Sequence, residues 1–160
     1  MDFKTLANQY RNELLDNVLP FWLEHSQDLE FGGYFTCLDR KGGVFDTDKF
    51  IWLQGREVWM FSMLYNKVEK RQEWLDCAVL GGEFLKKYGH NGDYNWYFSL
   101  NRSGRPLVEP YNIFSYTFAT MAFGQLSLAT GSQEYADIAK KTFEIILSKV
   151  DNPKEIGRAS

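Results

Sequence analysis

Residues 52 to 65 read Trp52-Leu53-Gln54-Gly55-Arg56-Glu57-Val58-Trp59-Met60-Phe61-Ser62-Met63-Leu64-Tyr65. When this stretch is placed on a helix, its apolar side chains cover nearly the whole circumference. A helix that is apolar all round belongs to the interior of a protein. The stretch therefore predicts a buried helix over about residues 52–68.

Other stretches of helical period surround this one. A second interior helix is predicted over residues 113–129, which are again apolar on most sides. Helices with one buried and one wet face are predicted over residues 3–24, 72–88 and 133–150. We expect Pro20 to bend the last turn of the first of them, and Gly89 to end the helix that precedes it.

Two aromatic-rich segments, 32–43 and 96–104, contain a polar, glycine-bearing turn and predict short β-hairpins. Leu38-Asp39-Arg40-Lys41-Gly42 aligns with Leu100-Asn101-Arg102-Ser103-Gly104 at an offset of 62 residues (100 − 38). Gln72-Glu73-Trp74-Leu75-Asp76 aligns with Gln133-Glu134-Tyr135-Ala136-Asp137 at an offset of 61 (133 − 72). A unit of hairpin, interior helix and one-faced helix therefore repeats.

Interior helices that alternate with one-faced helices describe an inner ring wrapped by an outer ring. Repeats of this kind bury their apolar faces only against their neighbours. A closed toroid of six helix pairs would need roughly 370 residues at this period, and this chain of 160 holds about two and a half units. We therefore expect residues 1–160 to form the N-terminal part of one all-α domain, an incomplete ring of about five helices with two short hairpins. Residues 151–160 are expected to lead onward.

The composition excludes several classes of function. A net charge of −3 and a pI near 5.4 argue against a nucleic-acid partner. The chain has no 18-residue apolar run and no apolar core of a signal peptide at its start, so we expect neither a membrane span nor export. Cys37 and Cys77 stand in unrelated segments and are expected to be unpaired thiols of a reduced, cytoplasmic protein. The aromatic share of 17% suits a large interior or a pocket lined by rings.

Arg56 is the most unusual residue of the central helix. Trp52, Arg56, Trp59 and Met63 share one helical face, which places a guanidinium inside an aromatic stripe. Because an unpaired buried charge costs several kcal/mol, Arg56 must meet a carboxylate or face a polar cavity. Either a glutamate of a neighbouring helix pairs with it, or it serves a ligand pocket in which Trp52 is core or a sugar platform. The adjacent glycine, which allows close approach near a helix start, favours the pocket.

Other chemistry-bearing residues are less promising. His25 and His90 lie in polar surroundings and are expected to be exposed, and no metal-ligand spacing is present. Asp39 and Asp46 are expected to be solvated turn residues. Gly81-Gly82 lies within a predicted helix and lacks the context of a phosphate loop.

Several strings of this sequence resemble the N-acylglucosamine 2-epimerase family over about residues 10–157. These are Phe21-Trp22-Leu23-Glu24-His25-Ser26, Gly32-Gly33-Tyr34-Phe35-Thr36-Cys37-Leu38, Trp52-Leu53-Gln54-Gly55-Arg56-Glu57-Val58-Trp59-Met60 and Gly81-Gly82-Glu83-Phe84-Leu85. They look closer to the N-acylglucosamine 2-epimerases proper than to the cellobiose epimerases or mannose isomerases that share the fold.

The resemblance implies an (α/α)6 barrel and the interconversion of N-acetylglucosamine and N-acetylmannosamine. In the family a base removes the C2 proton of the open-chain sugar, and the enediolate-like intermediate is reprotonated on the opposite face. Arg56 matches the arginine that stabilises the developing negative charge, and Trp52 and Phe114 match positions that line the sugar pocket. The acid/base histidines of the family lie in later helices, beyond Ser160.

The resemblance implies no required cofactor or metal, although some relatives use ATP as an effector, and a homodimer is a further expectation. Two alternatives stay open. One is a related mannose isomerase or cellobiose 2-epimerase. The other is a non-catalytic helical fragment that binds sugar weakly.

Overall fold

The computed structural model describes residues 2–110 and 113–152. The N-terminal helical segment comprises α1 (Phe3–Glu13), a π-helical turn (Leu14–Val18) and α2 (Leu19–His25). The remaining helices are α3 (Ile51–Lys67), α4 (Gln72–Tyr88), α5 (Phe114–Thr130) and α6 (Gln133–Lys149). The strands are β1 (Cys37–Leu38), β2 (Val44–Asp46), β3 (Lys49–Phe50), β4 (Ser99–Leu100) and β5 (Pro106–Val108). The expected five helical stretches and both hairpins are therefore confirmed.

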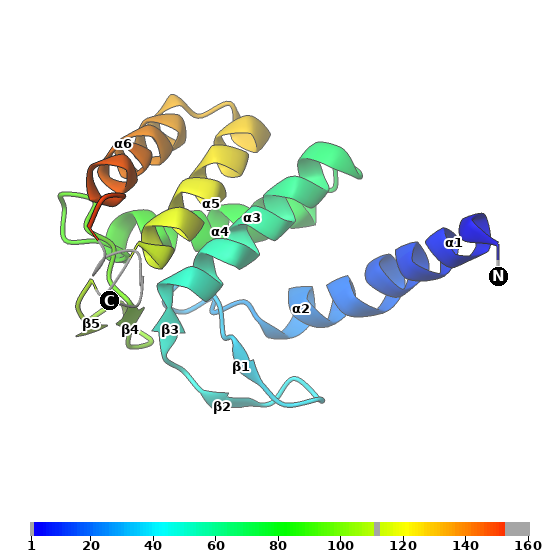
Figure 1. Ribbon diagram of the computed structural model, residues 1–160. Helices are drawn as coiled ribbons and strands as arrows, with labels where there is room; N and C mark the ends of the chain where they lie inside the picture. Colours follow the sequence, from blue (N-terminus) through cyan, green and yellow to red (C-terminus); the bar gives the residue numbers. More distant parts are fainter. Residues whose placement is uncertain (1, 111–112, 153–160) are drawn as a thin grey trace.

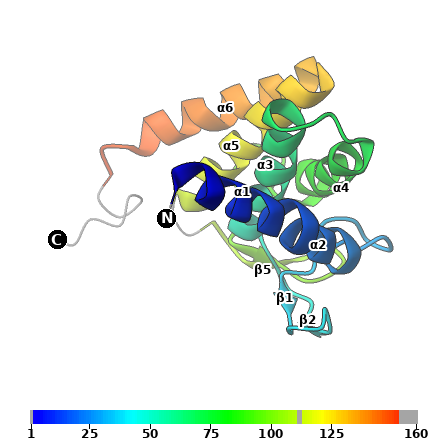
Figure 2. The ribbon, with the colours of Figure 1, turned by 90° about the vertical axis from the view of Figure 1, so that its right-hand side faces the viewer.

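The long helices form two layers. α3 packs against α5 in one layer, while α4 covers α3 and α6 covers α5 (Figure 1). The view from the side separates α4 and α6 from the α3–α5 pair (Figure 2). The buried residues of α4 include Trp74, Cys77, Ala78 and Gly81, which follow the helical period on one face. Inner helices alternate with outer ones, as the hydrophobic pattern predicts.

The repeat extends to single hydrogen bonds in the hairpin turns. Asp39 accepts the backbone N–H of Gly43 at 2.9 Å through its side chain, and Asn101 accepts that of Arg105 at 2.8 Å, 62 residues later. The backbone N–H of Gly42 donates to the carbonyl of Asp39 at 3.1 Å, and its counterpart in the second turn spans 3.0 Å. The outer helices also repeat, since Gln72 and Gln133 each donate to an aspartate one turn later at 2.8 Å.

Two equivalent aromatic side chains anchor the hairpins on the outer helices. The Tyr34 hydroxyl donates to the carbonyl of Cys77 in α4 at 2.7 Å, and the Trp96 indole donates to Oγ1 of Thr142 in α6 at 3.1 Å. Both aromatic residues are fully buried. A Cβ atom on Gly81 would overlap the Tyr34 ring, so this glycine serves packing.

The N-terminal helix departs from the expectation of one buried face. No residue of α1 is buried, and Phe3 and Tyr10 are 88% and 69% exposed. The segment projects from the body as a rod, and its first fully buried side chain is that of Leu19 (Figure 1). The expected irregularity also lies earlier, in the turn before Pro20, where the N–H of Leu19 reaches back to the carbonyl of Leu14 in π-helical fashion. Proline has no N–H to continue the regular ladder there.

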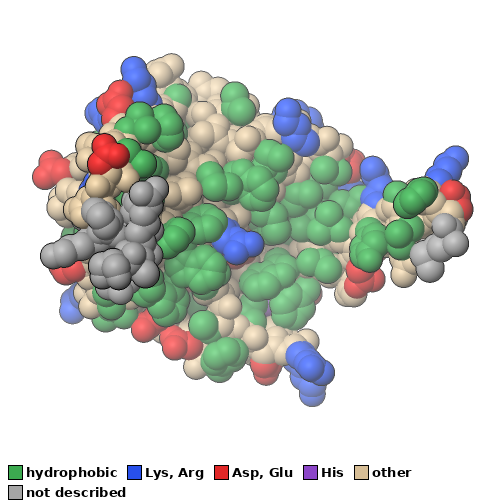
Figure 3. All heavy atoms as spheres, viewed as in Figure 1, with side chains coloured by type: hydrophobic (Ala, Val, Ile, Leu, Met, Phe, Trp, Pro, Cys, Tyr) green, Lys and Arg blue, Asp and Glu red, His purple; other side chains and the backbone are tan. Residues whose placement is uncertain are grey.

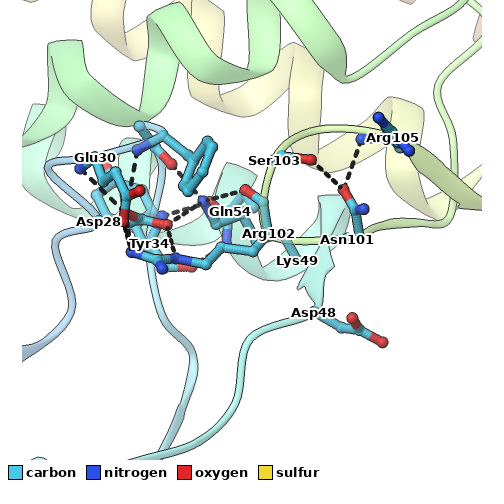
Figure 4. A network of polar contacts seen from close by, with 12 residues as sticks. Asp28, Glu30, Tyr34, Asp48, Lys49, Gln54, Asn101, Arg102, Ser103 and Arg105 are labelled. Atoms are coloured by element: carbon cyan, nitrogen blue, oxygen red, sulfur yellow. Dashed lines mark hydrogen bonds and ion pairs between the residues drawn. The ribbon is translucent and has the colours of Figure 1, made fainter.

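β3 was not expected from the sequence. It pairs antiparallel with β4, so the second hairpin becomes a three-stranded sheet in the order β3-β4-β5. The side chain of Lys49 on β3 is buried and donates to Asp28 at 2.9 Å and to the carbonyl of Gly32 (Figure 4). Arg102, from the β4–β5 turn, donates to both carboxylate oxygens of Asp28 at 2.9 and 3.0 Å. This cluster ties together the two repeat units.

Burial disfavours the ionised form of Asp28, but the hydrogen bonds from Arg102 and Lys49 outweigh it and lower the pKa of this carboxyl. Burial also lowers the pKa of Lys49, and its bond to Asp28 partly offsets that effect. Cys37 and Cys77 are both free thiols, as expected. Among the described residues no helix is long and apolar enough to cross a membrane. Of the onward-leading segment expected at 151–160, the residues from 153 lie outside the described part.

Candidate functional site

The free side of the α3–α5 layer, which faces the viewer in Figure 3, is covered by hydrophobic side chains with a basic group among them. On α3, the residues predicted to share a face all line hollows on this side. Trp52 lines one hollow, Arg56 and Trp59 line a second, and Met63 lines a third beside it. The helical spacing therefore located this surface correctly.

The hollow beside Arg56 has a volume of about 310 Å³. Its lining comes from α2, the segment before β1, and α3, and comprises Trp22, Thr36, Leu53, Arg56, Glu57, Trp59 and Met60. A second hollow of about 340 Å³ is lined by Trp52, Phe98, Phe114, Ser115 and Phe118. The two candidate sugar-pocket residues, Trp52 and Phe114, thus share one hollow, and Arg56 lines the other.

Arg56 lies between these two hollows. Its guanidinium carbon is 5.9 Å from the ring centroid of Trp52 and 5.7 Å from that of Phe118, within the range of cation–π attraction. The side chain is exposed, in contrast to the burial expected for it. Within the described ranges, no carboxylate lies at ion-pair distance from Arg56. Among the described residues, Arg56 therefore contacts aromatic rings and a hollow and has no carboxylate partner, and both alternatives for its role remain predictions.

The two residues before Arg56 have structural roles that the sequence did not reveal. The Gln54 side chain accepts a hydrogen bond from the backbone N–H of Tyr34 at 2.8 Å and donates one to its carbonyl at 2.9 Å. These two bonds hold the segment before β1 against α3. At Gly55, a Cβ atom would stand 2.9 Å from the carbonyl oxygen of Phe118. The glycine therefore permits close approach of helix α5 rather than of a ligand, and it sets Arg56 beside Phe118.

Glu57 is a site residue that the sequence reasoning missed. The residue is only 7% exposed and lies at the wall of the same hollow as Arg56. Oε1 lies 2.5 Å from the hydroxyl of Ser26, the residue that ends α2. Burial raises the pKa of Glu57 to about 8, against a smaller lowering by the Ser26 bond. In the sequence, the sign of such a role was that this glutamate stands within a helix whose side chains are mostly apolar on all sides.

The histidines lie outside the two hollows. Both are half-buried, which corrects the expectation that they would be exposed. His25 packs edge-on against Phe21, with ring centroids 4.9 Å apart, and covers the glycine turn of the first hairpin. His90 stacks on Tyr94 at 4.8 Å in a separate hollow between α4 and α6, and burial lowers its pKa. Neither is placed to transfer a proton beside Arg56.

Asp39 and Asp46 accept backbone N–H groups within their own turns and are exposed, as expected. Those bonds lower the pKa of Asp39. Among the described residues, no group of three His, Cys, Asp or Glu side chains could hold a metal ion.

A family model for N-acylglucosamine 2-epimerase matches residues 33–159. The chain belongs to the N-acylglucosamine 2-epimerase family. It is 44% identical over 149 residues to the N-acylglucosamine 2-epimerase of Bos taurus, which covers 90% of this chain and 35% of the relative. It is 28% identical over 149 residues to a cellobiose 2-epimerase of Dictyoglomus turgidum, covering 91% of this chain and 38% of that protein. The chain thus spans about a third of the length of these relatives.

Among solved structures, the cellobiose 2-epimerase from Bacillus thermoamylovorans B4167 matches with a TM-score of 0.81 and 29% identity. The match covers 91% of this chain and 38% of that structure. The (α/α)6 barrel expected from the repeat and from the family resemblance is therefore confirmed, with the described helices forming part of it.

Proposed function

We propose that this chain contributes the substrate-binding arginine of an N-acylglucosamine 2-epimerase, which interconverts N-acetylglucosamine and N-acetylmannosamine. The observation that carries this proposal is the place of Arg56: an exposed guanidinium between two aromatic rings and two hollows on the inner layer. The choice of sugar is supported by the greater identity to an N-acylglucosamine 2-epimerase than to a cellobiose 2-epimerase. Residues 1–160 then form the first part of a single barrel domain.

Epimerisation at C2 requires a cation near the substrate, and Arg56 is placed to supply it. Removal of the C2 proton from an open-chain sugar moves negative charge onto the neighbouring aldehyde oxygen. A guanidinium beside that oxygen stabilises the charge, and it does so more strongly than water where the site is closed to solvent. The partly buried ring of Trp52 and the exposed ring of Phe114 offer apolar surface for the carbon faces of the sugar.

Proton transfer needs groups beyond those around Arg56. Glu57 is the one other titratable residue in the lining of that hollow, and its raised pKa describes a carboxyl that holds its proton. We therefore assign the acid/base step to residues outside the described part, in keeping with the histidines of the later helices in this family. No cofactor is consumed in this scheme, since deprotonation beside an aldehyde is acid–base chemistry. The two free thiols support a reducing, cytoplasmic location.

The test is exchange of the C2 hydrogen in deuterium oxide, followed by NMR, with protein expressed from its intact gene. We expect N-acetylmannosamine to exchange at C2 and to yield N-acetylglucosamine, and parallel assays with ATP test for an effector. Exchange with mannose or cellobiose but not with N-acetylmannosamine would assign the protein to one of the related activities. Absence of exchange with all three sugars would leave weak sugar binding as the function.

A further inference from the structure

The hydroxyl of Ser26 stands between two oxygen atoms. Its Oγ lies 2.6 Å from the carbonyl oxygen of Trp22 and 2.5 Å from Oε1 of Glu57. The first distance is that of an O–H···O hydrogen bond, and the second is shorter than a normal one. A serine hydroxyl carries one proton and can donate to one of these oxygens only. The second contact needs a proton from elsewhere.

Counting protons assigns the missing one to Glu57. The Trp22 carbonyl cannot donate, so the Ser26 proton must point to it, or two oxygen lone pairs would face each other at 2.6 Å. The contact with Oε1 then requires a proton on Glu57, and an ionised carboxylate there would repeat the same conflict at 2.5 Å. The geometry is satisfied when Glu57 donates to Ser26 and Ser26 donates to Trp22.

The groups packed around Glu57 favour the same state. From the segment before β1 comes Tyr34, and from α4 comes Cys77, both acids whose pKa is raised by burial and which therefore carry no charge. From α2, the ring of His25 packs on Phe21. On α3, Arg56 contacts the rings of Trp52 and Phe118. Across residues 2–110 and 113–152, no cation pairs with Glu57, and its pKa of about 8 agrees with the proton count.

We propose that Glu57 is held as a neutral carboxylic acid and binds the sugar through its carbonyl oxygen, which accepts a hydrogen bond from an O–H or N–H group of a sugar that Arg56 also contacts. For the identity of that sugar, this role rests on the proposed function. Oε1 is taken by Ser26, which leaves Oε2 as the free oxygen of a residue that lines the same hollow as Arg56. Thr36 lines the same hollow.

Neutrality at Glu57 matters for the residue beside it. A carboxylate at this position would offset the positive potential that Arg56 supplies to the developing oxyanion, and the low polarity of the wall would magnify that effect. A neutral acid supplies an acceptor without that charge. Ionisation above about pH 8 therefore removes the proton from the Ser26 bond and weakens the stabilisation that Arg56 provides.

The experiment compares kcat/KM over a range of pH for the wild type, Glu57→Gln and Glu57→Ala, with protein expressed from its intact gene. Glutamine has the shape of the neutral acid, since its amide can donate to Ser26 while its carbonyl oxygen faces the hollow. We expect Glu57→Ala to lose about tenfold or more at pH 7, as for one lost hydrogen bond. Glu57→Gln should recover much of that loss and should lack the fall in activity above about pH 8 that the wild type shows.

A Glu57→Gln enzyme as inactive as Glu57→Ala, with native circular dichroism, would overturn the proposal, because it would show that the charge or the proton of Glu57 is needed. Persistence of the alkaline fall in Glu57→Gln would also overturn it. Glu24→Gln, which alters an exposed carboxylate two residues before Ser26, is the matched control and should leave the profile unchanged.

A second readout needs no sugar. Between the ordinary pKa of a glutamate near 4.5 and about 8, the unfolded chain releases the Glu57 proton and the folded chain keeps it. This group alone therefore lowers the stability of the wild type as the pH rises through that window. The Tm of Glu57→Gln relative to wild type should rise between about pH 5 and pH 8, and that of Glu24→Gln should not. If no sugar exchanges but this shift appears, the proposed function fails while the protonation of Glu57 stands; if activity is found without the shift, only the Glu57 proposal fails.

Discussion

Gly55 brings α3 so close to α5 that a Cβ atom at this position would stand 2.9 Å from the carbonyl oxygen of Phe118. The obstacle is backbone, so it cannot rotate away. The same contact sets the position of Arg56, because its guanidinium rests 5.7 Å from the Phe118 ring. The contact between Gly55 and Phe118 therefore sets both the packing of the two inner helices and the geometry of the candidate site.

Gly55→Ala should force α3 and α5 apart and lower the free energy of unfolding by about 1–3 kcal/mol, as overpacking does elsewhere. Urea unfolding measures this loss, and kcat/KM should fall with it because Arg56 moves relative to Phe118. The matched control is Gly124→Ala on α5, where nothing lies within 4 Å of the added carbon. There the better helix propensity of alanine should stabilise by about 0.5–1 kcal/mol. Equal effects at the two glycines would contradict the close-approach explanation.

Arg56→Ala should lower turnover far more than stability. The side chain is exposed and, among the described residues, has no ion-pair partner, so its removal leaves no buried charge behind. Loss of one oxyanion-stabilising group costs on the order of 10²–10³ in kcat. The measurement is kcat for N-acetylmannosamine together with Tm for the same preparations. A large drop in Tm with unchanged turnover would instead support a helix-tying role.

Much of the fold follows from periodicity alone. The all-round apolar pattern of 52–65 and the one-sided patterns of the outer helices predict the layers, and the aligned turns predict the repeat. A local hydrophobic pattern predicts that a face is buried, but it does not show which other element packs against that face. The stripe of Phe3 and Tyr10 predicts a buried face, but nothing within the described residues covers it.

The candidate site was only partly predictable for a related reason. The helical face of Trp52, Arg56 and Trp59 depends on spacing within one helix, so the sequence reveals it. The Ser26–Glu57 contact joins residues 31 positions apart, and the Asp28–Arg102 contact joins residues 74 apart. A local sequence pattern does not predict pairs so far apart in the chain. A charged residue of a hairpin turn, such as Arg102, is therefore expected to be solvated, although its partner Asp28 is buried.

The turn that repeats at Asp39 and Asn101 predicts which substitutions the hairpins accept. Both side chains accept the N–H four residues later, and the oxygen that does so is present in aspartate and asparagine alike. Asp39→Asn and Asn101→Asp should therefore leave the Tm nearly unchanged, whereas Asn101→Ala should lower it. Differential scanning calorimetry of the three variants is the check, and a loss in the two exchanges as large as in the alanine variant would show that the turns are not equivalent.

The buried pair of Lys49 and Asp28 should respond strongly to removal of either partner. Both side chains have no solvent exposure, and Lys49→Met leaves the Asp28 carboxylate with Arg102 and two backbone N–H groups as its partners. Removal of one partner costs about 3–5 kcal/mol when the other charge is left uncompensated, and because Arg102 still pairs with Asp28 we expect a loss near the lower end, about 3 kcal/mol. Glu69→Ala, which breaks the exposed pair with Arg71, is the control and should cost less than about 1 kcal/mol.

Asp28 also gives the pair a pH dependence with a definite sign. Because the pKa of Asp28 is lowered in the folded chain, its contribution to stability is present above the pKa of an unfolded aspartate, about 3.9, and is lost as the pH falls through the folded value. Asp28→Asn should therefore cost more stability at pH 7 than at pH 3, as measured by urea unfolding at both values. The same loss at both pH values would mean that the charge on Asp28 contributes nothing and that only its hydrogen bonds hold the two repeat units together.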